Sequence, residues 1–158
     1  MRAVLDTSAI IYLQDFRKFE EIFIPPSVKD EIKDRLSRMK LETLEPKIVE
    51  PEENFVKEIK TMAKRTGDLE RLSETDVQVL ALAKQVDAII VSDDYNIQNV
   101  AKKLGIKYLS VFSKGIKKLY FWEKYCPNCK KYFKRDLKEC PVCGAGLKRL
   151  PKGQGRNK

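Results

Sequence analysis

The sequence has no histidine in its 158 residues, and this absence excludes several kinds of site. Without imidazole there is no serine–histidine triad, no histidine general base and no histidine metal ligand. The chain also lacks an apolar run of about eighteen residues that could cross a bilayer. Charges at Arg2 and Asp6 interrupt its start before a secretory signal could develop. We therefore expect a cytoplasmic protein with no membrane partner, in which the four cysteines are more often metal ligands than disulfides.

Acidic residues are scarce in the C-terminal part of the chain. Residues 1–113 hold 18 Lys and Arg against 20 Asp and Glu, a net charge of −2, whereas residues 114–158 hold 14 against 3, a net charge of +11. Such a dense basic segment favours a polyanionic partner. The alternative is a solvated, charge-rich surface of the kind found in heat-adapted proteins. The missing acidic counterpart argues against this alternative for residues 114–158.

Strand-like and helix-like patterns alternate over residues 1–112. Short apolar runs predict strands at 2–5, 21–24, 87–92 and 106–111. Apolar spacing and capping residues predict helices at 7–13, 25–39, 53–64, from 73 onward and at 94–104. Residues 41–49 contain Pro46 and are expected to form edge strands at most. The alternation predicts an α/β fold in which helices cover both faces of a parallel sheet, giving three layers.

Two C-P-x-C pairs, Cys126/Cys129 and Cys140/Cys143, are separated by ten residues. Each pair brings two sulfurs together at a tight turn, and two pairs complete a tetrahedral four-sulfur site that suits one Zn²⁺. A rubredoxin-like iron and a redox-active cysteine pair are the alternatives. Because all four ligands come from protein, no position is left for a catalytic water. We expect a structural zinc that stabilises a ribbon too small to fold on its apolar core alone.

Basic and aromatic side chains surround the two cysteine pairs. Cations contact phosphates and aromatic faces stack on unpaired bases, which is how single-stranded nucleic acid is usually held. The residues predicted to bind RNA are Lys124, Lys130, Lys131, Tyr132, Lys134, Arg135, Lys148 and Arg149. About half of the aromatic side chains in this segment are expected to form the small core of the ribbon instead.

Carboxylates recur where an open parallel sheet binds its ligands, at the carboxyl ends of strands and at the helix starts that face them. Asp6 and Asp94 follow predicted strands, and Asp76 lies in the first turn of a helix. The helix that carries Glu31 can project it toward the same edge. Like charges repel when they are brought together, so such a cluster normally implies a cation. Each residue also has a structural interpretation, because Asp6 and Asp94 can cap helices and Asp76 can complete a capping box.

These motifs together resemble the PIN-domain nucleases. The pattern consists of Asp6-Thr7-Ser8-Ala9 after an N-terminal strand, Ser73-Glu74-Thr75-Asp76 at a helix start and Val91-Ser92-Asp93-Asp94 at a strand end. The stretch Asp93-Asp94-Tyr95-Asn96-Ile97-Gln98-Asn99-Val100-Ala101, followed by a C-P-x-C ribbon, is similar to the archaeal form of the Nob family, the endonucleases of small-ribosomal-subunit maturation. The resemblance covers residues 1–150.

The resemblance implies a metal-dependent endoribonuclease that cuts single-stranded RNA and forms the mature 3′ end of the small-subunit ribosomal RNA precursor. By motif, its catalytic residues are Asp6, Glu31, Asp76 and Asp94. Asp93 is an alternative to Asp94, and Asp30 is an alternative to Glu31. One or two Mg²⁺ or Mn²⁺ ions would be held by the carboxylates. The partners implied are the precursor RNA, the pre-ribosomal subunit and assembly-factor proteins, with the oligomeric state left open.

The predicted organisation is a nuclease domain at 1–112, a linker at 113–121, a zinc ribbon at 122–150 and a disordered basic tail at 151–158. Three other functions fit parts of the pattern. The first is a non-catalytic RNA-binding factor of ribosome assembly, and the second is a toxin-type PIN ribonuclease. The third is a receiver-like phosphate-binding domain. The appended ribbon argues against the second, and the basic ribbon is unexplained by the third.

Overall fold

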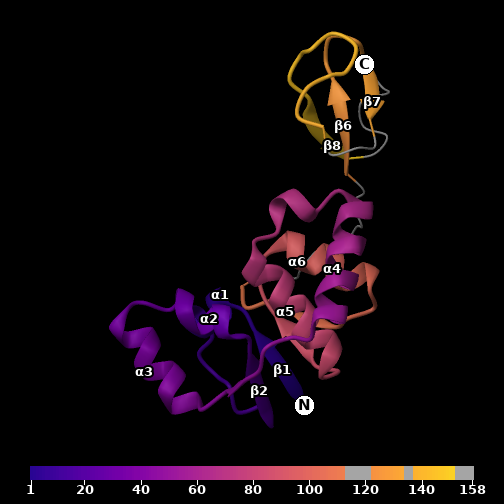
Figure 1. Cartoon of the computed structure of the whole chain (residues 1–158). Coiled ribbons are helices and arrows are strands. Elements are labelled where there is room, and N and C mark those ends of the chain that lie inside the picture. The colour runs from indigo at the N-terminus through magenta and orange to yellow at the C-terminus, as the bar shows by residue number, and fades with distance from the viewer. Residues whose placement is uncertain (113–121, 134–136, 152–158) are drawn as a thin grey trace.

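The structure, a computed structural model, describes residues 1–112, 122–133 and 137–151 and contains two sheets (Figure 1). The larger sheet has five parallel strands in the order β3-β2-β1-β4-β5. These strands are β1 (Arg2–Leu5), β2 (Glu21–Ile24), β3 (Lys47–Ile48), β4 (Ile89–Val91) and β5 (Tyr108–Leu109). The predicted parallel α/β fold is confirmed for this part of the chain.

Strand β1 is the centre of the sheet and the point at which the strand order reverses. The chain passes from β1 to β2 on one side and later enters β4 on the other side. Val4, Leu5 and Ile90 have no exposed surface, because helices cover both faces of these strands. Leu5 pairs with Val91, so the carboxyl ends of β1 and β4 lie side by side. Open α/β sheets bind their ligands at this position.

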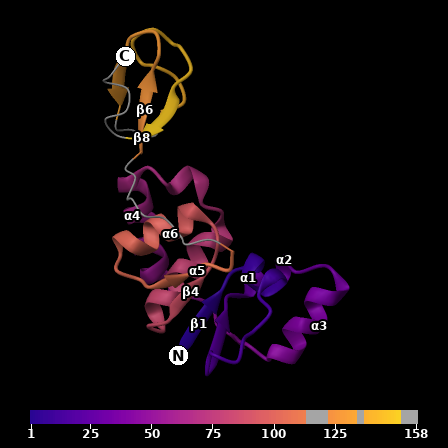
Figure 2. The same cartoon turned by 180° about the vertical axis from the view of Figure 1, so that it is seen from behind.

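Two groups of helices flank the sheet. The first group is α1 (Thr7–Tyr12), α2 (Pro26–Glu31) and α3 (Arg35–Leu44), and the second is α4 (Glu53–Thr66), α5 (Glu74–Gln85) and α6 (Tyr95–Lys103). A 3₁₀ turn, Leu69–Arg71, joins α4 to α5. Figures 1 and 2 show α3 and the α4–α6 group on opposite sides of β1 and β2, as right-handed crossovers between parallel strands require.

The sequence of each helix in the second group explains how it packs. Helix α5 is apolar on several faces and contacts β1, β2 and β4, so Val77 and Leu80 are buried against the sheet. Helix α4 is amphipathic and buries Ile59 and Ala63. It ends at Gly67, whose positive φ of 77° is a left-handed conformation that glycine adopts without strain.

The single helix predicted over 25–39 is wrong. The chain forms two helices, α2 and α3, because Ile32 has extended backbone angles and Asp34 caps the second helix by accepting the N–H of Ser37 at 2.9 Å. Glu31 is therefore the last residue of α2 and not a mid-helix residue. Ser27 does not cap α2, since its hydroxyl donates to Oε1 of Gln78 at 2.5 Å.

Residues 41–49 agree with the prediction in part. Helix α3 continues to Leu44, and only Lys47–Ile48 form a strand. That strand, β3, lies at the edge of the sheet. Pro46, which has no N–H to donate, is tolerated next to an edge strand but would interrupt the hydrogen bonds of a central one. The predicted strands at 87–92 and 106–111 are shorter than expected, at Ile89–Val91 and Tyr108–Leu109.

The smaller sheet has three antiparallel strands in the order β7-β6-β8. They are β6 (Trp122–Cys126), β7 (Lys131–Phe133) and β8 (Lys148–Pro151). An isolated bridge between Glu139 and Gly146 supports the turn that carries the second cysteine pair. We call residues 122–151 the ribbon.

Several predictions fall on parts of the chain outside the described residues. The linker at 113–121, the RNA-binding candidates Lys134 and Arg135, and residues 152–158 of the tail belong to this group. Pro151, the first residue of the predicted tail, ends β8. The division into domains at these boundaries stays a prediction. Over the described ranges, no helix has the length and apolar character that a bilayer crossing requires.

Candidate functional site

A cavity of about 380 Å³ opens at the carboxyl edge of the sheet, between the ends of β1 and β4 and the start of α5. Its lining is rich in carboxylates and hydroxyls. The residues that line it are Asp6, Thr7, Ser8, Glu31, Thr75, Asp76, Asp93 and Asp94. The structure thus brings together all four predicted catalytic carboxylates, which come from four separate elements of the chain.

Asp6 both caps a helix and lines the cavity. It follows β1 directly and is only 7% exposed. Its Oδ1 accepts the N–H of Ala9 at 2.7 Å and the hydroxyl of Ser8 at 2.8 Å, which fixes the start of α1. These bonds hold the carboxylate rigidly at the edge of the sheet.

Asp76 and Asp94 are also held by helix caps. Asp76 forms a capping box with Ser73, in which its Oδ2 accepts the N–H of Ser73 at 2.8 Å and its own N–H donates to the Ser73 hydroxyl at 3.1 Å. Asp94 caps α6, and its Oδ1 accepts the N–H of Asn96 at 2.7 Å. Each cap bond uses one carboxylate oxygen, and an ionised carboxylate has a second oxygen for another ligand.

Asp93 has a different environment from Asp94. Its Oδ1 accepts the N–H of Val111 at 3.0 Å, the N–H of Phe112 at 3.2 Å and the hydroxyl of Ser110. Asp93 thereby fastens the segment after β5 to the end of β4. Asp93 and Asp94 both line the cavity, and Asp94 remains the metal ligand that the sequence motif predicts.

Glu31 reaches the cavity from α2, and a neighbour on α1 holds it there. The hydroxyl of Thr7 donates to Oε2 of Glu31 at 2.6 Å. Both side chains are exposed, but Glu31 lines the cavity and Asp30 does not. The geometry therefore favours Glu31 over Asp30. Sequence analysis did not identify Thr7 as the residue that positions Glu31, because the two residues are 24 positions apart.

The carboxylates of the cavity influence one another electrostatically. Burial raises the pKa of Asp6, and the charge of Asp94 raises it further, against hydrogen bonds from Ser92, Ala9 and Ser8 that lower it. Burial likewise raises the pKa of Asp76, and the charges of Asp94 and Asp6 add to this effect. Mutual repulsion of this kind is relieved when a cation binds among the carboxylates.

The spacing of these carboxylates is wider than that of the cysteines. In the described parts of the chain, one group of three or more potential metal ligands has all its donor atoms within 4.8 Å of one another, and this group is the four cysteines. The carboxylate oxygens are oxygen donors of the hard type that Mg²⁺ and Mn²⁺ prefer. Their wider spacing is compatible with ions that keep part of their water shell.

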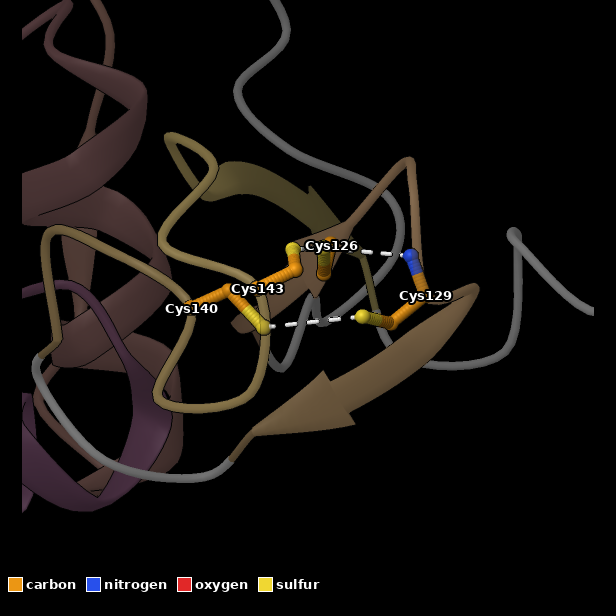
Figure 3. A group of neighbouring side chains, drawn as sticks. All are labelled: Cys126, Cys129, Cys140 and Cys143. Atoms are coloured by element: carbon orange, nitrogen blue, oxygen red, sulfur yellow. Dashed lines mark hydrogen bonds between the residues drawn. The ribbon is translucent and has the colours of Figure 1, made fainter.

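The four cysteine side chains point toward a common centre from two turns of the ribbon (Figure 3). The sulfurs of Cys126 and Cys143 are 3.5 Å apart, and those of Cys140 and Cys129 are 3.9 Å apart. A tetrahedral Zn²⁺ with bonds of about 2.3 Å separates its sulfur ligands by about 3.8 Å. The cluster therefore fits a zinc-type four-sulfur site.

Each cysteine pair is closed by the same backbone turn. The N–H of Lys130 donates to the carbonyl of Cys126 at 2.8 Å, and the N–H of Gly144 donates to the carbonyl of Cys140 at 2.9 Å. Lys130 and Gly144 both have positive φ angles, 54° and 74°. The residue after each second cysteine thus adopts the left-handed conformation that reverses the chain and turns both sulfurs inward.

The thiols of this cluster do not titrate independently. The backbone N–H of Ala145 and the side chain of Asn128 lower the pKa of Cys143 to about 6. A hydrogen bond shared with Cys143 raises the pKa of Cys129 to about 12. One sulfur therefore ionises first and is held by its neighbours. Since metal ligands must be thiolates, a metal ion that bound here would displace the proton that Cys129 retains.

Two of the predicted RNA-binding residues contact the α/β part of the chain. Nζ of Lys124 forms an ion pair with Glu70 at 2.8 Å. The guanidinium of Arg149 donates to the carbonyl of Gly67 at 2.8 Å and pairs with Asp68 at 3.3 Å. Both cations are mostly buried by these contacts, with side-chain exposures of 17% and 12%.

The remaining described candidates on the ribbon differ in exposure. Lys130, Lys131 and Lys148 are exposed. Tyr132 is half-buried, its ring packs on Tyr125 with centroids 5.0 Å apart, and its hydroxyl has no hydrogen-bond partner among the described residues. Tyr132 therefore belongs to the small core of the ribbon, the alternative that the sequence analysis allowed for part of the aromatic set.

Comparison with known proteins identifies the family of the chain. The family described as "PIN domain of ribonuclease" matches residues 3–86, and the family described as "PINc domain ribonuclease" matches residues 53–120. Endoribonuclease Nob1 of Pyrococcus abyssi is 41% identical over 160 residues, which cover 98% of this chain and 96% of the relative. The chain belongs to the Nob family of PIN-domain endoribonucleases.

Two other relatives show the breadth of this family. Ribonuclease VapC1 of Thermoplasma acidophilum is 42% identical over 148 residues, which cover 92% of this chain and 76% of the relative. The 20S-pre-rRNA D-site endonuclease nob1 of Schizosaccharomyces pombe is 32% identical over 99 residues, which cover 60% of this chain and 26% of the relative. The Pyrococcus match spans the α/β part and the ribbon, so the ribbon is common to this chain and that Nob1 protein.

Proposed function

We propose that this Nob-family endoribonuclease uses divalent metal ions in the carboxylate cavity to cut a single-stranded segment of the small-subunit ribosomal RNA precursor at its mature 3′ end. The observation that carries the proposal is the cavity itself, in which Asp6, Glu31, Asp76 and Asp94 meet at the carboxyl edge of the sheet. The printed name of the Schizosaccharomyces pombe relative, a D-site endonuclease of 20S pre-rRNA, supports this substrate class.

The donor set supports Mg²⁺ or Mn²⁺, one ion or two, because the cavity offers carboxylates and hydroxyls and the chain has no histidine. When bound, such an ion lowers the pKa of a coordinated water and stabilises the departing 3′ oxygen. Without a cation, four carboxylates would repel the phosphate backbone. Asp6, Asp76 and Asp94 are proposed to hold the ions.

The local structure prepares these residues for that role. The caps of α1, α5 and α6 fix Asp6, Asp76 and Asp94, so little side-chain entropy is lost when a metal binds. Glu31 is proposed to complete the set, in the orientation that the Thr7 hydroxyl holds. An RNA phosphate bound at this edge also lies near the positive end of the α6 dipole.

The ribbon is proposed to bind one structural Zn²⁺ through Cys126, Cys129, Cys140 and Cys143 and to hold the RNA. Its exposed lysines, among them Lys130, Lys131 and Lys148, can contact phosphates. Lys124 and Arg149 are engaged with the α/β part in this structure, so their contribution to RNA binding would require that contact to open. The net charge of +11 over residues 114–158 supports this division of tasks.

Substitution of one cavity carboxylate tests the proposal. Asp6→Asn keeps an oxygen for the cap bonds of α1 but removes the charge that holds a cation. We expect cleavage of a short RNA that spans the mature 3′ end to fall by at least about 10³-fold, with RNA affinity unchanged or raised. The matched control is Asp15→Asn. Asp15 is an exposed carboxylate that pairs with Arg17 and does not line the cavity, so this variant should cut RNA at the normal rate.

The assay is carried out with Mn²⁺ or Mg²⁺ and with EDTA. Cleavage that persists in Asp6→Asn at the rate of the Asp15→Asn control would remove Asp6 from the mechanism. Tight RNA binding by the unsubstituted chain, without cutting in any metal, would instead support a non-catalytic role in ribosome assembly.

A further inference from the structure

Three exposed aromatic side chains lie on segments that adjoin the carboxylate cavity. Among the side chains that the structure describes, the exposed aromatic ones are Tyr12 at 52%, Tyr95 at 56% and Phe112 at 71%. Tyr95 directly follows Asp94, which lines the cavity. Tyr12 ends the helix that begins beside the cavity at Thr7. The described aromatic side chains of the ribbon, in contrast, are half-buried.

Two of these aromatic rings are in contact, although they come from distant parts of the sequence. The rings of Tyr12 and Phe112 meet edge to face, with centroids 5.3 Å apart and an interplanar angle of 62°. An edge-to-face contact covers a face of one ring only, and the exposure of both side chains indicates that other ring faces are open to solvent. We call this pair of side chains, Tyr12 and Phe112, the aromatic corner; it lies at the end of α1.

A cavity residue fixes the position of this aromatic corner. Asp93 lines the cavity and accepts the N–H of Phe112 at 3.2 Å and that of Val111 at 3.0 Å. The backbone that carries the Phe112 ring is thus tied directly to the wall of the carboxylate site. A ligand on the open ring faces would be adjacent to whatever the cavity holds.

A cation lies close to the same corner. Nζ of Lys40 donates to the carbonyl of Ile11 at 3.1 Å, at the end of α1 next to Tyr12. Open aromatic faces with a nearby cation are the combination that binds single-stranded nucleic acid, in which bases stack and phosphates contact cations. A paired base is already stacked inside its duplex and cannot offer its face in this way.

We propose that Tyr12 and Phe112 form a stacking site for one unpaired base of the RNA, in a nucleotide next to the phosphate that the cavity binds. This inference rests on the proposed function, and it names the feature of the substrate that the site reads. Stacking accepts any base but requires that the base be unpaired. The aromatic corner therefore selects single-stranded RNA without selecting its sequence.

The test measures equilibrium binding of the full chain to an unstructured RNA of about a dozen nucleotides. The Asp6→Asn background prevents cutting during the measurement. A series of RNAs carries a single abasic nucleotide, moved one position at a time. We expect one abasic position to weaken binding by roughly five- to fiftyfold, and the double variant Tyr12→Ala/Phe112→Ala to bind intact RNA more weakly by a similar factor.

Three comparisons make the result specific. The double variant should no longer distinguish intact RNA from the sensitive abasic RNA. Tyr12→Phe combined with Phe112→Tyr keeps both rings and should restore the distinction. Leu36→Ala on α3 removes another exposed apolar side chain, 79% exposed and outside the cavity lining, and should bind as the parent does.

The outcomes separate this inference from the proposed function. If the unsubstituted chain cuts RNA but the double variant keeps the full abasic penalty, the stacking site is refuted and the nuclease proposal stands. If the chain binds with the predicted penalty but never cuts, the stacking site stands and the nuclease proposal fails. If no abasic position weakens binding to the parent chain, the stacking site is refuted. That result would be expected if the exposed aromatic side chains bind a protein instead of RNA.

Discussion

Asp6, Asp76 and Asp94 each perform a structural task at the place where a metal site needs a charge. The sequence offered both interpretations, capping and metal binding, and the structure shows that capping holds for all three while all three also line one cavity. The two roles coincide because helix starts that face strand ends lie at the same edge of the sheet. Sequence alone could not separate Glu31 from Asp30, since the separation depends on where α2 ends.

Glu31 provides the residue-scale prediction. Glu31→Gln should lower the rate of metal-dependent cleavage by at least about tenfold, because an amide binds divalent cations more weakly than a carboxylate. Asp30 is the neighbouring exposed residue and does not line the cavity, so Asp30→Asn should leave the rate within about twofold of that of the unsubstituted chain. The check is a single-turnover rate in Mn²⁺ for both variants. Equal losses in the two variants, or a loss in Asp30→Asn alone, would contradict the assignment of Glu31.

At the scale of elements, short apolar runs were enough to predict where the strands lie, whereas the break between α2 and α3 was missed. The strands at β1 and β2 have their predicted bounds, because a short apolar run between polar residues has few alternatives. The break between α2 and α3 carries no glycine or proline at Ile32-Lys33-Asp34. It forms because Asp34 caps α3, and an aspartate inside a helical pattern does not by itself indicate a boundary.

The ribbon provides the element-scale prediction. Its three short strands bury little apolar surface, so the metal should supply most of its stability. We expect one zinc ion per chain by elemental analysis. Removal of this ion with a strong chelator should abolish the amide protection of β6, β7 and β8 in hydrogen exchange while β1 and β4 stay protected. Visible absorbance from bound iron, or unchanged protection after chelation, would contradict a structural zinc site.

At the scale of the whole molecule, a buried charge joins the ribbon to the α/β part. Asp68 has no exposed surface and follows the end of α4. Its carboxylate is paired with Lys103 at 3.5 Å and with Arg149 of the ribbon at 3.3 Å, and it accepts from Thr66 and Asn99 at 2.5 and 2.9 Å. Arg149 was predicted to bind RNA from the basic composition of its segment, and its 81-residue separation from Asp68 leaves no local signal of this contact.

Arg149 provides the prediction at this scale. Arg149→Ala should lower the free energy of unfolding by about 1–3 kcal/mol, because Asp68 stays buried with fewer donors. Lys148→Ala on the same strand removes an exposed cation and serves as the matched control, with an expected change below about 0.5 kcal/mol. Urea unfolding followed by circular dichroism measures both. Equal midpoints for the two variants would show that the contact does not stabilise the molecule.

The chemistry of the cleaved ends tests the central claim most directly. The full chain is incubated with Mn²⁺ and a short RNA spanning the mature 3′ end, and the products are analysed by mass spectrometry. Water activated at the carboxylate cavity should leave a 3′-hydroxyl and a 5′-phosphate at a single position, and EDTA should prevent the reaction. Products with a 2′,3′-cyclic phosphate, formed equally well in EDTA, would contradict the account, because they would mean that the RNA's own 2′-hydroxyl made the attack without a metal ion.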